Sequence, residues 1–206
     1  MINFNDHFNT DGLDQFGNPQ HIWYYNMVGT APQHKGTTTF NAPIVPVTID
    51  LRNADGSPRF VNGQRLISRP DAFIMPVLNS PIFQDFTYSS SGVPTQYTDA
   101  VQRAEFFDRA KPDWHTLLNP SVKTGRTMVL IQGTYRFALN GDGTCCLFVL
   151  VDINTFQNEL FPPTFPVDNS TPVGAAELAG DITTQDISTF LFPNTYLYFN
   201  GDPSQC

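Results

Sequence analysis

Residues 145–153 read CCLFVLVDI, an apolar run without alternation of apolar and polar side chains. A strand of this kind is covered on both faces, because its side chains avoid water whichever way they point. The preceding segment, residues 127–139, alternates and is typical of a strand with one buried face. The glycine-rich residues 140–143 supply a turn between the two segments. We therefore predict a central antiparallel hairpin over residues 127–153.

Other strands are predicted around this hairpin. Residues 43–51 alternate, which favours a half-buried strand with one apolar face formed by Val45, Val47, Ile49 and Leu51. Glycine- and proline-bounded segments predict a small exposed hairpin at 59–67, an apolar strand at 72–78 and a last strand at 195–200.

Helical periodicity is clearest over residues 95–110. The spacing predicts a surface helix that buries one face, made of Tyr97, Ala100, Val101, Ala104 and Phe107. Asp99 with Arg103 and Glu105 with Arg109 are acid-before-base pairs at i, i+4, which stabilise a helix by a few tenths of a kcal/mol each. Thr183 and Asp186 form a variant capping box, which predicts a short second helix after residue 183.

The predicted fold class is α+β and rich in strands, with the central hairpin in a mixed sheet and two or three helices. The 206 residues suit one domain. Residues 1–36 are polar and rich in Gly and Asn, so we expect an N-terminal arm with one short strand at 21–29. Residues 37–206 form the predicted domain.

Composition and charge limit the partners. Charged residues make up 15% of the chain and the formal net charge is -8, so phosphate-bearing nucleic acid and anionic membrane surfaces are not expected to bind. No apolar run reaches the ~20 residues that span a membrane. The uncharged polar surface residues favour a secreted or periplasmic protein. Residues 1–9 have no signal-peptide pattern, so either an exported chain has lost its signal or the protein is cytosolic and never had one.

The three cysteines, Cys145, Cys146 and Cys206, leave several arrangements open. Neighbouring strand residues point to opposite faces, so Cys145 and Cys146 do not both reach one partner. One of them forms a disulfide with Cys206 if the strands at 145–153 and 195–200 are neighbours. The alternatives are buried thiols or a strained bridge between the adjacent pair, and the absence of a CxxC pair makes a metal site a poor hypothesis. An odd cysteine in an exported protein also suggests a partner beyond residue 206.

The best local constellation for chemistry is EFFDRAKPDWHT at 105–116. Asp108, Asp113 and His115 place carboxylates near an imidazole, which suits general acid–base catalysis or a hard-metal site. Trp114 is positioned to wall a pocket. The alternative is that these residues are simply solvated at a helix end. Because the chain has no GxSxG, HExxH or phosphate-binding glycine motif, we identify no metal site or cofactor in it.

A second hypothesis rests on the aromatic run Trp23, Tyr24 and Tyr25. Exposed rings stack on apolar faces of sugars and of other ligands. Such rings favour a non-catalytic extracellular module that binds carbohydrate or protein, whereas buried rings would belong to packing. Solvent exposure distinguishes the two interpretations.

Three long segments carry a resemblance to known proteins: residues 80–107, 113–130 and 181–206. From about residue 43 onward the chain resembles a group of exported proteins of soil bacteria, notably Acidobacteria. In that group a later half carries a histidine–glutamate helix motif of the zinc-metallopeptidase type. The resemblance implies that this chain is the N-terminal part of an exported hydrolase that acts on an extracellular polymer or peptide. It also implies a divalent metal in the later half, and strand edges left uncovered would permit self-association.

Overall fold

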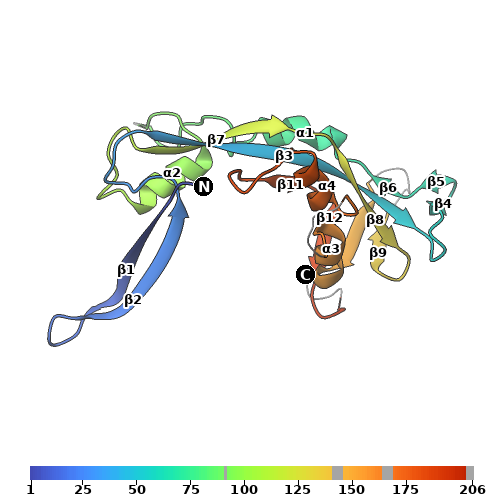
Figure 1. Ribbon diagram of the computed structural model, residues 1–206, viewed down its shortest axis with the longest axis horizontal. Helices are drawn as coiled ribbons and strands as arrows, with labels where there is room; N and C mark the ends of the chain where they lie inside the picture. Colours follow the sequence, from blue (N-terminus) through green and yellow to red (C-terminus); the bar gives the residue numbers. More distant parts are fainter. Residues whose placement is uncertain (91, 141–145, 164–168, 203–206) are drawn as a thin grey trace. The chain divides into compact units, whose positions relative to one another are not determined.

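The alternating segment around Val47 lies in β3 (Thr37–Arg52), a long strand of the computed structural model (Figure 1). Val45, Val47 and Ile49 are fully buried, as the alternation predicted. The opposite face is covered as well, since Asp50 is only 2% exposed. The expectation of a half-buried strand is therefore wrong, because β3 has neighbours along its length. Two of these neighbours, β11 (Thr189–Leu191) and β8 (Arg126–Ile131), run parallel to β3. A third, β6 (Ile67–Ser68), runs antiparallel to it, and β7 (His115–Val122) also pairs with it.

The structure describes residues 1–90, 92–140, 146–163 and 169–202. The chain forms two compact units. Unit 1 comprises Met1–Asn41 and Ser80–Asn119, and unit 2 comprises Ala42–Asn79 and Pro120–Cys206. The sequence analysis predicted other boundaries, with an arm over 1–36 and a domain over 37–206, and that division stays a prediction.

The predicted central hairpin is formed in unit 2 by β9 (Tyr135–Ala138) and β10 (Phe148–Asp152). β12 (Thr195–Tyr198) lies on the other side of β10 and runs parallel to it. Residues 127–139 are not one strand, because the chain turns at Gly133 (φ 103°) and divides β8 from β9. Parallel and antiparallel pairings occur together in this β-rich protein, so the predicted α+β class is confirmed.

Two helices that the sequence analysis missed cover this part of unit 2. α3 (Ile153–Leu160) begins where Asp152 accepts a hydrogen bond from the backbone N–H of Asn154, and α4 (Pro172–Leu178) begins at the capping residue Thr171. Both helices contact β8. Their inner side chains join the core with Val149 and Val151. They bring the number of helices in the described residues to four, against two or three predicted.

Two local predictions in unit 2 are wrong. The apolar run at 72–78 lies in a helix, α1 (Asp71–Leu78), since a short apolar run fits either structure and Pro70 precedes it as N-cap. Asp186 does accept hydrogen bonds from the backbone and hydroxyl of Thr183, but only a turn forms there. The chain then enters β11 instead of a helix. The small exposed hairpin is confirmed as β4 (Phe60–Val61) and β5 (Gln64–Arg65).

Unit 1 contains a hairpin where one short strand was expected. β1 (Asn3–Leu13) pairs antiparallel with β2 (Pro19–Val28), and Figure 1 shows this ribbon extending away from α2 (Tyr97–Glu105). Its base is held by ring contacts with Phe106, whose ring lies edge-on to Phe4 at 6.0 Å and tilted against Tyr25 at 5.9 Å between centroids. No helix in the described residues is long and apolar enough to cross a membrane.

We predict that Leu51→Ala lowers the free energy of unfolding by about 2–5 kcal/mol, because it opens a cavity beneath a fully buried side chain. Urea denaturation measures the loss. Val122→Ala is the matched control, since Val122 is 42% exposed. A surface change of this kind is expected to cost no more than about 0.5 kcal/mol. Equal losses in the two variants would contradict the burial of β3.

Candidate functional site

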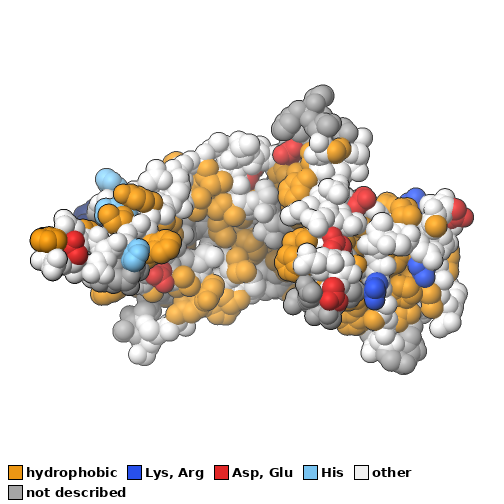
Figure 2. All heavy atoms as spheres, turned by 90° about the horizontal axis from the view of Figure 1, so that it is seen from below, with side chains coloured by type: hydrophobic (Ala, Val, Ile, Leu, Met, Phe, Trp, Pro, Cys, Tyr) orange, Lys and Arg blue, Asp and Glu red, His pale blue; other side chains and the backbone are white. Residues whose placement is uncertain are grey.

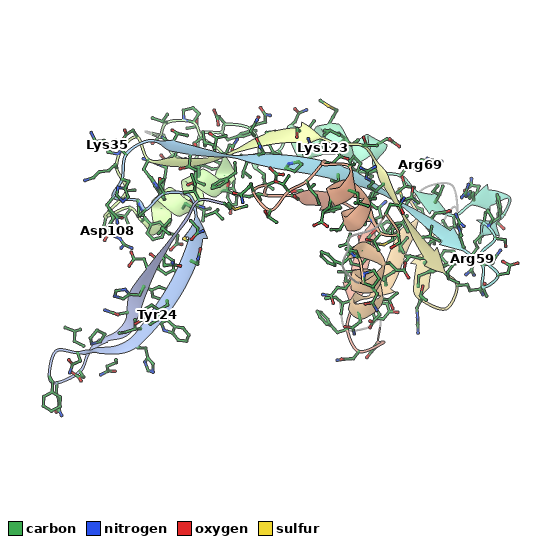
Figure 3. The ribbon with its side chains drawn as sticks, in the orientation of Figure 1. Tyr24, Lys35, Arg59, Arg69, Asp108 and Lys123 are labelled. Atoms are coloured by element: carbon green, nitrogen blue, oxygen red, sulfur yellow. The ribbon has the colours of Figure 1, made fainter. Side chains whose placement is uncertain are left out.

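The three predicted catalytic residues do not form one cluster. His115 begins β7 and is half-buried, whereas Asp108 and Asp113 are exposed. Figure 3 labels Asp108 beyond the end of α2, and its side chain is 64% exposed. In the described part of the chain, no hydrogen bond or ion pair joins either aspartate to His115. A catalytic role for Asp108 and Asp113 stays a prediction.

Asp99, which the sequence analysis paired with Arg103, is the carboxylate beside His115. Its Oδ2 lies 2.8 Å from Nδ1 of His115. The same oxygen accepts a hydrogen bond from the hydroxyl of Thr95 at 2.7 Å, and Oδ1 accepts the backbone N–H of Thr116 at 2.7 Å. Asp99 is fully buried. No linear motif links it to His115, because the two lie sixteen positions apart.

The orientation of α2 explains this placement. The predicted inner face is exposed at Tyr97, Val101 and Phe107, and the buried residues along the segment are Gln96, Asp99 and Phe106. Gln96 accepts the backbone N–H of Leu118 at 2.7 Å and donates to the carbonyl of Leu118 at 2.8 Å. Polar side chains of this segment therefore satisfy backbone groups of β7, as buried N–H and C=O groups require.

A depression of about 480 Å³ lies beside this pair. Its lining includes His115, Ser89, Arg103 and Tyr88. The guanidinium of Arg103 donates to the carbonyls of Trp114 and Lys111, and not to the carboxylate of Asp99 as predicted. Desolvation, with contributions from Tyr97 and Asp85, raises the pKa of Tyr88 above its ordinary value of 10.0.

Trp114 does not wall this depression. Its side chain is fully buried, and its Nε1–H donates to the carbonyl of Thr30 at 2.8 Å. The ring also lies edge-on to Phe106, with 6.0 Å between centroids. The indole therefore packs within unit 1, and the prediction of a pocket wall is wrong.

The second candidate site is the aromatic run on β2. Trp23 is 55% exposed and Tyr24 is 79% exposed, whereas Tyr25 is half-buried against Phe4, Phe8 and Phe106. Figure 2 shows hydrophobic and histidine side chains together at the surface over β1 and β2, at the left of the view. Strand alternation turns Tyr24 to the face opposite Trp23 and Tyr25. The three aromatic residues therefore lie on two faces of the hairpin, and the face that carries Tyr25 is partly buried by packing.

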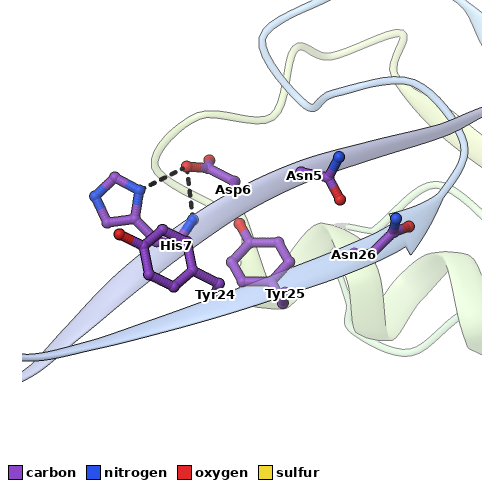
Figure 4. Close-up of a pocket in the computed structure, with 6 residues that line it drawn as sticks. All are labelled: Asn5, Asp6, His7, Tyr24, Tyr25 and Asn26. Atoms are coloured by element: carbon purple, nitrogen blue, oxygen red, sulfur yellow. Dashed lines mark hydrogen bonds and ion pairs between the residues drawn. The ribbon is translucent and has the colours of Figure 1, made fainter.

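We call the face that carries Tyr24 the amide face. By register it holds Asn5, His7 and Asn9 of β1 opposite Asn26, Tyr24 and Ile22 of β2. The ring of His7 lies 5.8 Å from that of Tyr24, tilted by 46° (Figure 4). Asn5, Asn26 and these two rings help line an open depression of about 600 Å³.

The base of the hairpin is tied to the segment after α2 by charge. Asp6 accepts a hydrogen bond from Arg109 at 2.6 Å and another from the backbone N–H of His7 at 2.8 Å. These bonds hold the pKa of Asp6 below its ordinary value of 3.8, the backbone bond having the larger effect. Hydrogen bonds to Tyr25 and Asp6 raise the pKa of Arg109.

The cysteine hypothesis is tested only in part. Cys145 and Cys206 lie outside the described residues, and Cys146 is exposed with a left-handed backbone (φ 59°). β10 and β12 are neighbours, which was the condition stated for pairing, but the disulfide itself stays a prediction. The described residues contain no group of three or more His, Cys, Asp or Glu side chains arranged to hold a metal ion.

Comparison of the chain with protein-family models, curated proteins and solved structures finds no match. The resemblance to exported proteins of soil bacteria therefore stays a prediction. Any function assigned to the chain rests on the geometry of the amide face and of the Asp99–His115 pair.

We predict that Asp99→Ala lowers the free energy of unfolding by about 3–5 kcal/mol, because it leaves three buried or half-buried donors without their acceptor. Chemical denaturation measures the change. Asp108→Ala, which removes an exposed carboxylate, is the matched control and is expected to cost no more than about 0.5 kcal/mol. A small effect of Asp99→Ala would contradict its role as the buried acceptor.

The carboxylate of Asp6 is expected to make stability depend on pH. The pKa of Asp6 is lower in the folded state than its ordinary value of 3.8. The hydrogen bonds of its carboxylate to Arg109 and His7 therefore stabilise the fold fully when the pH is above 3.8. The stabilisation is lost as the pH falls through the folded pKa. Thermal unfolding of the wild type and Asp6→Asn should therefore differ at about pH 6 and converge once the pH falls below the folded-state pKa of Asp6. Asp113→Asn controls for the change in net charge. A difference that persists in acid would contradict the assignment.

Proposed function

We propose that this chain is a carbohydrate-binding module of an exported protein, with the amide face as its binding surface. The observation that carries the proposal is the 79% exposure of Tyr24 among the carboxamides of Asn5, Asn9 and Asn26. An aromatic ring offers a flat apolar surface, and each carboxamide offers both donors and an acceptor.

The chemistry of a neutral sugar matches this surface. Sugar hydroxyls both donate and accept hydrogen bonds, as a carboxamide does, and the C–H faces of the sugar ring stack on aromatic rings. Within the described residues, no hydrogen bond engages the carboxamide of Asn5 or Asn9, so both remain available to a ligand. The fully buried core of a protein–protein interface is more apolar than its rim, whereas carboxamides stand between the apolar side chains of the amide face.

Packing does not account for Tyr24. The neighbouring Tyr25 contacts three phenylalanine rings and receives a hydrogen bond from Arg109 at 3.4 Å. Among the described residues, the one aromatic ring that contacts Tyr24 is the exposed ring of His7. Figure 3 shows Tyr24 on the hairpin at a distance from α2. Its ring is therefore free to receive a ligand without rearrangement of the aromatic packing at the hairpin base.

Export is part of the proposal and rests on composition. A charged fraction of 15% with abundant Asn, Thr and Ser favours an exported protein over a cytosolic one. Residues 1–34 contain three Asp and no Lys, Arg or Glu, so the hairpin itself offers no cationic side chain to an anionic polysaccharide. The partner class follows as a neutral extracellular glycan. Self-association stays a separate prediction that sedimentation can check.

Membership of a hydrolase remains the second candidate function. The observation that favours it is the buried Asp99 beside His115 at the edge of a depression. A divalent metal, expected from the resemblance in a later part of such a protein, has no assigned ligands here. A binding module and a hydrolytic site are compatible within one protein.

We predict that Tyr24→Ala weakens binding of a soluble neutral polysaccharide about 3–10-fold, the effect of one stacked ring worth about 0.5–1.5 kcal/mol. Affinity electrophoresis in gels that contain xylan, mannan or mixed-linkage glucan measures retardation. Tyr196→Ala is the matched control, because Tyr196 is a 49% exposed strand residue in unit 2. Two outcomes would contradict the proposal. In one, neither the wild type nor Tyr196→Ala is retarded; in the other, the wild type, Tyr24→Ala and Tyr196→Ala are retarded equally.

A further inference from the structure

The Asp99–His115 pair has a geometry that goes beyond holding α2 against β7. The backbone N–H of Thr116 and the hydroxyl of Thr95 already give Asp99 two donors. A carboxylate that accepts from both of these groups has no proton of its own to donate to the imidazole. The proton between Asp99 and His115 therefore belongs to Nδ1 of the imidazole.

This tautomer leaves the lone pair on Nε2. His115 lines the depression of about 480 Å³, and its side chain is 25% exposed. Since Nδ1 is directed to the buried carboxylate, Nε2 is the ring nitrogen available to a molecule in the depression. A neutral imidazole held in this way is a general base, because a fixed carboxylate stabilises the imidazolium that forms.

Arg103 lines the same depression. The carbonyls of Trp114 and Lys111 hold its guanidinium, and in the described residues it has no ion pair with a carboxylate. A guanidinium has five N–H donors, so donors remain for a negatively charged oxygen. His115 and Arg103 thus line one depression. Attack of water on a carbonyl group uses a base to take the proton and a positive group to stabilise the negative oxygen that forms.

We propose that this depression is a hydrolytic site for carboxylic esters, with His115 as general base and Asp99 as its positioning residue. His115 Nε2 takes a proton from water while the water oxygen bonds to the ester carbonyl carbon. Arg103 stabilises the negative oxygen of the tetrahedral intermediate. The intermediate collapses as the bond from carbon to the alcohol oxygen breaks, and His115 returns the proton to the leaving alkoxide.

The proposal is independent of glycan binding. No residue of the amide face lines the depression, and Tyr24 plays no part in the proton transfer. Loss of sugar binding in Tyr24→Ala would leave ester hydrolysis unchanged, and the reverse holds for variants of His115.

The test is release of p-nitrophenolate from p-nitrophenyl acetate by the full chain. We expect hydrolysis above the buffer rate, and His115→Gln should lower kcat/KM at least about 100-fold while its amide still donates to Asp99. His34→Gln is the matched control, because His34 is exposed and outside the depression, and it should keep the wild-type rate. Circular dichroism confirms folding of both variants. A wild type without activity, or a folded His115→Gln with the wild-type rate, overturns the proposal.

Three further measurements separate chemistry from structure. Asp99→Asn should lower kcat with little change in KM, a division that a merely loosened fold would not give. Ser89→Ala should retain most of the rate, because water is the nucleophile. Abolition of the rate in Ser89→Ala would overturn the water step. Histidine-selective acylation of the wild type, followed by mass spectrometry, should show activity lost in step with modification of His115 and not of His34.

Discussion

The hydrogen bonds between α2 and β7 are the constraint on which unit 1 depends. Gln96 and Asp99 satisfy backbone groups of Leu118 and Thr116 with side chains, where a further strand would ordinarily do so with backbone. Burial makes these bonds obligatory, because an unpaired buried N–H costs about 1–3 kcal/mol. They fix the rotation of α2, and that rotation places Phe106 against the hairpin and Arg103 beside His115.

The same constraint explains why sequence reasoning chose the wrong face of α2. Residues 97, 100, 101, 104 and 107 have helical spacing, but so do 96, 99, 103 and 106, displaced by one position. Hydrophobicity favours the first set as the buried face, but a hydrophobic pattern takes no account of the backbone groups of β7 that need hydrogen-bond partners. Three members of the second set are buried, Gln96, Asp99 and Phe106, and two of these are polar, so the preference for this face is visible only when β7 is in place. His115 could be selected from the sequence, whereas its partner Asp99 could not.

Strands were predicted well where burial alone determines them. The core residues of β3 and the hairpin of β9 with β10 follow from apolar patterns, because these side chains have no alternative to the interior. Prediction failed where a short apolar run fitted two structures, as in α1. It also failed where the signal was a single cap: Asp152 and Thr171 begin α3 and α4, and both could have been recognised as N-caps.

The exposure of Tyr24 is in part a consequence of packing elsewhere. A two-stranded ribbon is marginally stable alone, so the hairpin needs Tyr25 and Asp6 directed at Phe106 and Arg109. Alternation then forces Tyr24 outward. Geometry does not force the identity of its neighbours, however. Natural edge strands are commonly protected by lysine, and this hairpin has none. Asparagines around the exposed ring keep hydrogen-bond donors and acceptors on the amide face, and the proposed binding of a neutral glycan uses these groups.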